Sequence, residues 1–251
     1  MASLPEIVQY ADDFLHIRGI EEYPNALNGL QIENSGEVTR IAAAVDASTQ
    51  TLRKAAQQRA NLLIVHHGLF WAGLKPVTGT LRGQIKLAFE QDVALYSAHL
   101  PLDYHPEIGN NALLARALGI ESFEPFLEMK GRAIGVKAPL KRDREQLLTD
   151  LEAAVGGPVH CTRAGPAETR LVGIVTGSAG GEVYAAAADG VDTYITGEAP
   201  HWAAVAAEEL GINLILGGHY ATETFGVKAL AAHLAERFKV PWFFVDHPTG
   251  L

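Results

Sequence analysis

The sequence predicts an α/β protein made of two similar α/β halves that are related by an internal duplication. We expect the halves to be residues 1–125 and 126–251 and to form together one compact unit. Short apolar segments alternate with helical segments along the chain, which is the pattern of an α/β protein. A pattern in the first half recurs 130 residues later, and in both halves a third apolar strand ends in a histidine.

The first predicted strand of each half begins with the residues Thr-Arg. Residues 39–48 (TRIAAAVDAS) are an apolar run that leads into a helix, and residues 169–178 (TRLVGIVTGS) repeat this pattern 130 positions later. In the first half, either Ser48 or Thr49 can cap the helix, which we expect to continue through Arg59.

The second predicted strands differ in the polar residues at their ends. Residues 62–68 (LLIVHHG) align at the same offset with residues 192–198 (DTYITGE). The strand end therefore carries His66 and His67 in the first half and Glu198 in the second. A single histidine at a strand end is usually a hydrogen-bonded packing residue, but two adjacent histidines favour a binding role.

The third predicted strands are residues 93–99 (VALYSAH) and 212–219 (INLILGGH), which end in His99 and His219. In open α/β sheets, functional groups collect at the carboxyl ends of the strands. We therefore expect these histidines at the functional edge of each sheet.

Two further carboxylates follow the third strands. Pro101 and Pro106 disfavour helix, so we expect Asp103 on a loop, from which its carboxylate can point inward or merely cap a turn. His219 and Glu223 are four residues apart, and a helix that begins near Tyr220 would place both side chains on one face. A solvated surface pair is the alternative for these two residues.

A metal site accounts for these residues as a set. Imidazole and carboxylate mixtures suit zinc, iron or manganese, whereas calcium and magnesium prefer oxygen ligands alone. Cys161 is the only cysteine, so a cluster of thiolates within one chain is excluded. Five ligands exceed the three that one catalytic zinc usually takes, so we expect a dinuclear centre between the halves. The candidate ligands are His66, His67, Asp103, His219 and Glu223.

The composition limits the other classes of function. The chain has 48% hydrophobic and 20% charged residues, and no apolar run is long enough to span a membrane. A net charge of -9 argues against a general nucleic-acid surface, because phosphate binding needs clustered basic residues. The N-terminal residues lack the features of a signal peptide, so we expect a cytoplasmic location.

Several short motifs together resemble a known family, the GTP cyclohydrolase 1 type 2 homologues, which are also described as dinuclear metal centre hexameric proteins. The motifs are NGLQIE at Asn28, VDAS at Val45, VHHGLFW at Val65, HLPLD at His99, GNNALLA at Gly109, ITGE at Ile195, GHYATE at Gly218 and VDHP at Val245. The resemblance covers the full length of the chain. It implies that the five candidate residues are metal ligands, with Glu223 bridging, and that six chains form a toroid.

Two classes of function are compatible with these features. The first is a metal-dependent hydrolase of a small heterocyclic or phosphate-containing substrate, with Glu198 as a catalytic residue and His99 in a supporting position. The second is a metal-binding chaperone or regulatory ring without turnover. Phe70, Trp71 and Trp202 could offer a stacking wall for a flat base, or they could belong to the core. Phe70, Trp71 and Phe225 could instead anchor an interface between subunits.

Overall fold

The computed structural model describes residues 2–71, 73, 75–129 and 131–250, which divide into two compact units. Within the described residues, the first unit comprises 2–102 and 226–247, and the second comprises 103–225 and 248–250. These bounds differ from the predicted halves because residues 103–125 belong to the second unit and the last helix and strand of the chain belong to the first. Each unit contains one large β-sheet.

The sheet of the first unit has five strands in the order β13-β4-β5-β6-β2. Strands β13, β4, β5 and β6 are parallel, and β2 pairs with β6 in the antiparallel direction. Their bounds are Trp242–Phe244 (β13), Ile41–Asp46 (β4), Leu62–His67 (β5), Ala94–Ser97 (β6) and Gly29–Ile32 (β2). A separate two-stranded ladder joins β1 (Ala2–Ser3) to β3 (Glu37–Val38).

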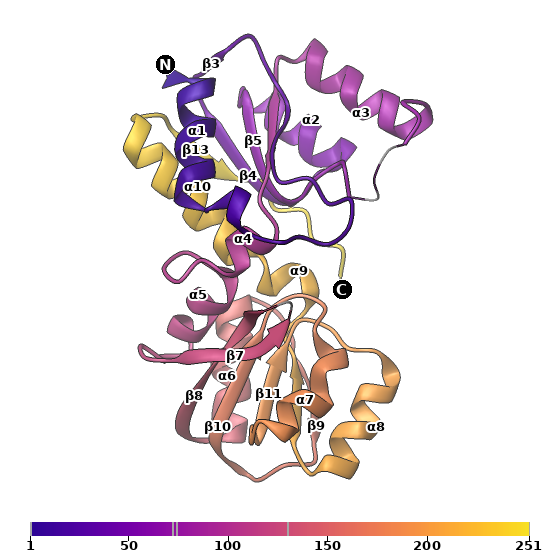
Figure 1. The fold of residues 1–251 in the computed structure, drawn as a ribbon, viewed down its shortest axis with the longest axis vertical. Helices are drawn as coiled ribbons and strands as arrows, with labels where there is room; N and C mark the ends of the chain where they lie inside the picture. The colour runs from indigo at the N-terminus through magenta and orange to yellow at the C-terminus, as the bar shows by residue number, and fades with distance from the viewer. Residues whose placement is uncertain (1, 72, 74, 130, 251) are drawn as a thin grey trace. The chain divides into compact units, whose positions relative to one another are not determined.

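Helices cover both faces of this sheet, with α2 and α3 on one side and α1 and α10 on the other (Figure 1). Leu52 and Ala55 of α2 share a buried cluster with Ala44 and Val65 of the strands. On the opposite face, the hydroxyl of the buried Tyr96 donates to a carboxylate of α1 at 2.9 Å. The bounds are Leu4–Phe14 (α1), Thr49–Gln57 (α2), Gly79–Glu90 (α3) and Thr224–Phe238 (α10), with a 3-10 turn at Ile17–Gly19 (η1).

The cap of α2 is Ser48, which decides between the two predicted capping residues. Its hydroxyl accepts from the Thr51 backbone N–H at 3.1 Å, and the Thr51 hydroxyl accepts from the Ser48 N–H at 2.9 Å. This reciprocal pair satisfies two of the backbone donors that a helix leaves unpaired at its start. The helix ends at Gln57, before the predicted Arg59, which has a left-handed φ of 59°.

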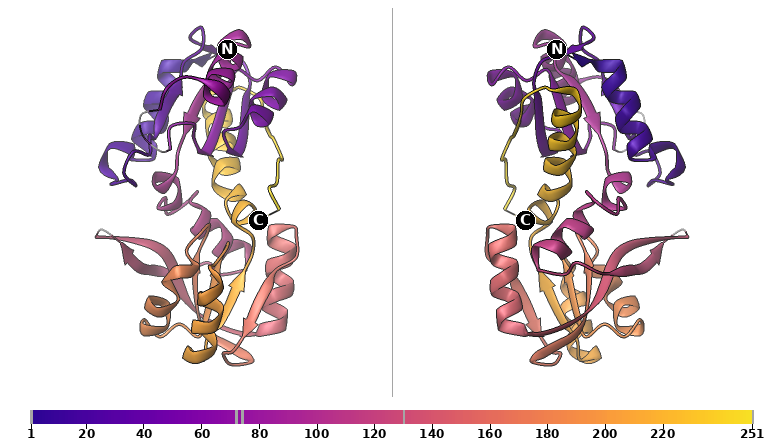
Figure 2. Two further views of the ribbon diagram at one scale, coloured as in Figure 1. Left: turned by 90° about the vertical axis from the view of Figure 1, so that its right-hand side faces the viewer. Right: turned by 90° about the vertical axis from the view of Figure 1, so that its left-hand side faces the viewer.

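The sheet of the second unit has six strands in the order β7-β8-β10-β11-β12-β9. The three central strands β10, β11 and β12 are parallel, and the outer strands run antiparallel to their neighbours. The bounds are Glu124–Met129 (β7), Arg132–Asp143 (β8), Glu168–Val175 (β10), Thr193–Thr196 (β11), Asn213–Leu216 (β12) and His160–Arg163 (β9). The long antiparallel pair β7 and β8 is visible in both views of Figure 2.

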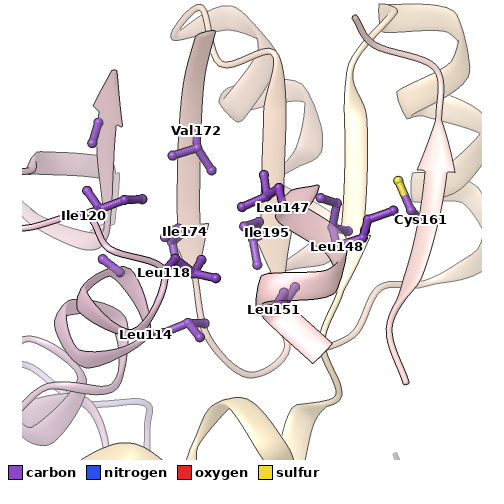
Figure 3. Packing of buried hydrophobic residues seen from close by; sticks show 13 residues of the cluster. Leu114, Leu118, Ile120, Leu147, Leu148, Leu151, Cys161, Val172, Ile174 and Ile195 are labelled. Carbon is purple, nitrogen blue, oxygen red and sulfur yellow. The ribbon is translucent and has the colours of Figure 1, made fainter. Parts of the chain in front are cut away.

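Two hydrophobic clusters fix the helices of the second unit to its sheet. Leu147 and Leu151 of α6 lie against Ile174 and Ile195 on one face (Figure 3). On the other face, α7 and α8 pack over the buried Tyr194. The bounds are Asn110–Ala117 (α5), Arg144–Val155 (α6), Val183–Ala188 (α7), His201–Leu210 (α8) and His219–Thr222 (α9), with a 3-10 turn at Gly180–Glu182 (η2).

The mixed α/β class is confirmed, and the three predicted strands of each half are parallel neighbours. They are β4, β5 and β6 in the first unit and β10, β11 and β12 in the second. The duplication that would explain this correspondence stays a prediction. In the part of the chain that the structure describes, no helix has both the length and the apolar character needed to cross a membrane.

Candidate metal centre

His66 is fully buried at the end of β5, and its ring orientation is fixed by the backbone. Its Nδ1 lies 2.9 Å from the carbonyl oxygen of Ala98. Because a carbonyl oxygen only accepts, Nδ1 carries the proton, and the lone pair of the neutral ring is on Nε2. This is the protonation pattern of a histidine that binds a metal through Nε2.

His67 is the last residue of β5 and is oriented by a carboxylate from the neighbouring strand. The parallel register of β4 and β5 places Asp46 opposite His67, and Asp46 Oδ1 lies 2.9 Å from His67 Nδ1. The side chains are 22% and 36% exposed, so water reaches this pair. Sequence reasoning missed Asp46, although it ends the strand that pairs with the one carrying His67.

His99 is held by Glu22, a second residue that sequence reasoning missed. Glu22 Oε1 lies 3.0 Å from His99 Nδ1, and both side chains are only 10% exposed. The same carboxylate accepts from the Asn28 amide and the Leu100 N–H. Burial alone would raise the pKa of Glu22, but the hydrogen bond from His99 and the other donors outweigh it and hold the pKa below its ordinary value.

Three imidazoles of the first unit therefore form one group of candidate ligands. His66, His67 and His99 each offer a nitrogen, and these nitrogens lie within 4.8 Å of one another. We predicted His99 as a supporting residue beside the ligands, and the structure places it in the same group. Strand β5 brings the first two residues to the sheet edge, and the segment after β6 brings the third.

In the second unit, His219 and Glu223 contact each other directly. His219 Nε2 lies 3.1 Å from Glu223 Oε2, and His219 Nδ1 lies 3.0 Å from Glu198 Oε1. The hydrogen bond with the buried Glu223 is the main cause that raises the pKa of His219 to about 9. The predicted helix is present as α9, which begins at His219, and the two side chains lie together as its spacing predicts. Glu223 is the C-cap residue of this short helix, which ends at Thr222.

The backbone leaves room for this pair at Gly177, which follows β10. A Cβ at this position would clash with Glu223 Oε1 and would lie 3.6 Å from His219 Nε2. Gly177 also has a left-handed φ of 71°, which glycine adopts without strain. The absence of a side chain here is therefore a requirement for the buried Glu223 carboxylate.

Asp103 belongs to the second unit, and its predicted loop is wrong. It ends the one-turn helix α4 (Leu100–Asp103), in which Pro101 is tolerated because first-turn N–H groups have no partner within the helix. The Asn110 amide donates to Asp103 Oδ1 at 2.7 Å. Among the described residues, Asp103 is in no group of three or more candidate ligands whose atoms lie within 4.8 Å of one another.

The chemistry of these residues fits transition metal ions. Imidazole nitrogen and carboxylate oxygen are ligands of zinc, iron and manganese. Metal-binding histidines almost always donate their other ring N–H to a carboxylate or a carbonyl oxygen, which fixes the ring. Each of the four histidines described above has such an oxygen at 2.9 or 3.0 Å from Nδ1.

The fold and these side chains define a class: a two-unit α/β protein with a candidate transition-metal centre. The chain belongs to the Duf34/NIF3 (NGG1p interacting factor 3) family, whose model matches residues 2–249. The resemblance to the GTP cyclohydrolase 1 type 2 homologues is thereby confirmed at the level of the family.

Named relatives and solved structures agree with this assignment. The GTP cyclohydrolase 1 type 2 homolog of Deinococcus radiodurans is 44% identical over 255 residues, which cover 98% of this chain and 94% of the relative. TTHA1606 from Thermus thermophilus superposes with a TM-score of 0.91 at 40% identity and covers 99% of this chain and 100% of its own. HcgD from Methanocaldococcus jannaschii, with a TM-score of 0.87 at 24% identity and 98% coverage of both chains, shows the fold alone.

Proposed function

We propose that the protein binds two divalent transition metal ions per chain and hydrolyses a small substrate that carries a heterocycle or a phosphate. The ions would be zinc, iron or manganese. One observation carries the proposal: in each of four histidines Nδ1 lies 2.9 or 3.0 Å from an oxygen acceptor, which is the arrangement typical of metal-binding histidines. In His219 the other nitrogen, Nε2, contacts Glu223 Oε2, which is itself a proposed ligand. The proposed ligands are His66, His67, Asp103, His219 and Glu223.

Two bound ions would supply Lewis acidity, which lowers the pKa of coordinated water and polarises a substrate oxygen. The residues of the chain supply orientation and proton transfer. Glu198 accepts from His219 through Oε1, and its side chain is 41% exposed, so that it can also exchange protons with water. We propose Glu198 as the general base and His99, held by Glu22, as the residue that orients the reactants beside the ligands.

The proposal extends to the assembly and the location of the protein. We propose a homohexameric toroid, which the resemblance to dinuclear metal centre hexameric proteins supports. We also propose a cytoplasmic location.

A screen for hydrolysis tests the proposed reaction. The metal-loaded full chain should be assayed against nucleotides, phosphoesters and cyclic amides, together with the variants Glu223→Gln and Glu209→Gln. Glu209 lies on α8 and is exposed, so its variant is a matched control for the same chemical change. The proposal predicts turnover that Glu223→Gln abolishes and Glu209→Gln preserves. If no substrate class is turned over, the protein is a metal-binding ring without catalysis, and the hydrolase proposal is wrong.

A further inference from the structure

Two exposed aromatic side chains lie beside the imidazole group of the first unit. Tyr23 is 43% exposed and Trp71 is 40% exposed, although large aromatic rings lose favourable contacts when they face water. The Trp71 ring meets the His99 ring edge to face at a centroid distance of 4.3 Å, and it meets the His67 ring at 5.4 Å. The Tyr23 ring lies 5.8 Å from that of His99. We call Tyr23 and Trp71 the aromatic rim.

Hydrogen bonds hold the segment of Tyr23 against His99. The Tyr23 N–H donates to Glu22 Oε1 at 2.8 Å, and this oxygen also accepts from His99 Nδ1. The amide of Asn28 donates to the other Glu22 oxygen at 2.9 Å, while its carbonyl accepts from the His99 N–H at 2.8 Å. One buried carboxylate and one amide therefore position Tyr23 and His99 together.

A second set of contacts ties the same segment to the residues before Trp71. The Leu27 N–H donates to the Phe70 carbonyl at 3.1 Å. The Gln31 side chain donates to the Leu27 carbonyl at 2.6 Å and accepts from the Leu69 N–H at 2.8 Å. These hydrogen bonds fix the backbone near Tyr23 and the backbone that precedes Trp71. The two exposed rings are therefore held in defined positions.

The arrangement of the two rings suits a planar ligand. Their planes are tilted by 46° and their centroids are 6.4 Å apart, so the rings form a corner and do not cover each other's faces. By contrast, the exposed rings of Tyr184 and Trp202 in the second unit are nearly parallel, at 15°, and shield each other by stacking. A partly exposed aromatic ring attracts a flat π-system, because offset stacking and edge contacts are favourable.

We propose that the aromatic rim binds the planar heteroaromatic ring of the substrate. This inference rests on the proposed function and narrows its substrate class from heterocyclic or phosphate-containing compounds to those with an aromatic ring system. Stacking on Trp71 or Tyr23 places the edge of such a ring next to His67 and His99, where its nitrogen and oxygen atoms reach the candidate ligands. Sequence reasoning considered Trp71 for stacking and missed Tyr23 as the second ring of this binding site.

Calorimetric titration of the zinc-loaded full chain with guanosine, uridine and ribose 5-phosphate tests this inference without any need for turnover. Guanosine should bind most tightly, uridine more weakly, and ribose 5-phosphate, which lacks a ring, least of all. Tyr23→Ala and Trp71→Ala should each weaken guanosine binding by about 5- to 150-fold, the range for the loss of one stacking partner. Trp71→Phe and Tyr23→Phe should retain most of the affinity.

Matched control variants show whether a loss of binding is specific to the aromatic rim or follows from the removal of any exposed aromatic ring. Tyr184→Ala and Trp202→Ala remove rings of the same types with similar exposure from the second unit, and they should leave guanosine binding unchanged. Equal losses in both pairs of variants, or ribose 5-phosphate binding as tightly as guanosine, would overturn the inference. So would a change in the mass of the assembly in Tyr23→Ala or Trp71→Ala without a change in binding, because the aromatic rim would then be a contact between copies.

The failure of this inference is distinguishable from that of the proposed function. If the protein holds its metal and hydrolyses a substrate but binds no ring compound, only the role of the aromatic rim is wrong. The opposite outcome is a protein that binds guanosine at the aromatic rim but holds no transition metal under any loading condition. In that case the proposed metal-dependent function is wrong, whereas the proposed role of the aromatic rim is supported.

Discussion

Removal of the Asp46 carboxylate should weaken metal binding while the fold remains intact. Asp46 Oδ1 accepts the hydrogen bond from His67 Nδ1 at 2.9 Å, which fixes the imidazole and makes its other nitrogen a stronger ligand. In Asp46→Ala the ring can rotate, and the negative charge that favours its binding to a cation is lost. Because Asp46 is a supporting residue, the ions would still have their direct ligands.

The expected loss of metal affinity depends on how deeply the carboxylate and its histidine are buried. Loss of such a supporting partner typically reduces metal affinity by about 10- to 100-fold, or about 1.4 to 2.7 kcal/mol. Asp46 and His67 are 36% and 22% exposed, so water can replace part of the lost contact, and we expect a loss of about 10-fold. Glu22 and His99 are both 10% exposed, and Glu22→Ala should cost about 100-fold if His99 serves the centre.

A competition titration with a chromophoric zinc chelator measures these affinities, and circular dichroism checks that each variant is folded. Asp46→Asn should restore most of the affinity, since the amide oxygen still accepts from His67. Asp150→Ala is a matched control, because Asp150 makes an ion pair of the same 2.9 Å length with Arg142 at similar exposure. Unchanged zinc affinity in Asp46→Ala, or an equal loss in Asp150→Ala, would refute the reasoning.

Three other predictions concern the ligands, the base and the assembly. His67→Ala and His219→Ala should each lower the metal content measured by elemental analysis and leave the circular dichroism spectrum unchanged, since apolar strands form the core. Full occupancy in both variants would contradict their assignment. Glu198→Gln should lower turnover by roughly 10²- to 10⁴-fold with little change in metal content, because the amide oxygen can still accept from His219. Full activity would leave Glu198 without a catalytic role. Light scattering should give a mass about six times the 26.9 kDa of one chain, and a monomer at micromolar concentration would exclude the ring.

Much of the sheet edge with the histidines was predictable from sequence. The apolar run before His66 and His67 forms β5, and the parallel strands on either side bring Asp46 and His99 to the same edge. Asp46 was predictable in the same way, because parallel pairing aligns the ends of consecutive strands. A single aspartate at a strand end is also a common helix-capping residue, so its identity alone does not distinguish the two roles.

Other parts depend on contacts that local patterns do not encode. Glu22 lies in an irregular segment, 77 positions before His99, and no periodicity marks it as the partner of an imidazole. The short α4 formed despite Pro101, because the proline occupies a turn in which its missing N–H costs nothing. The three-residue strand β13 pairs with β4 from the far end of the chain, and so short an apolar run has no distinctive period.

Elemental analysis of the full chain tests the central claim of a dinuclear centre most directly. Protein that is purified without chelators and then reloaded with zinc, iron or manganese should contain close to two transition metal ions per chain. This number follows from five ligands of which two are carboxylates, more than one catalytic zinc usually takes from a protein. A content of one ion or fewer per chain after reloading would contradict the dinuclear centre.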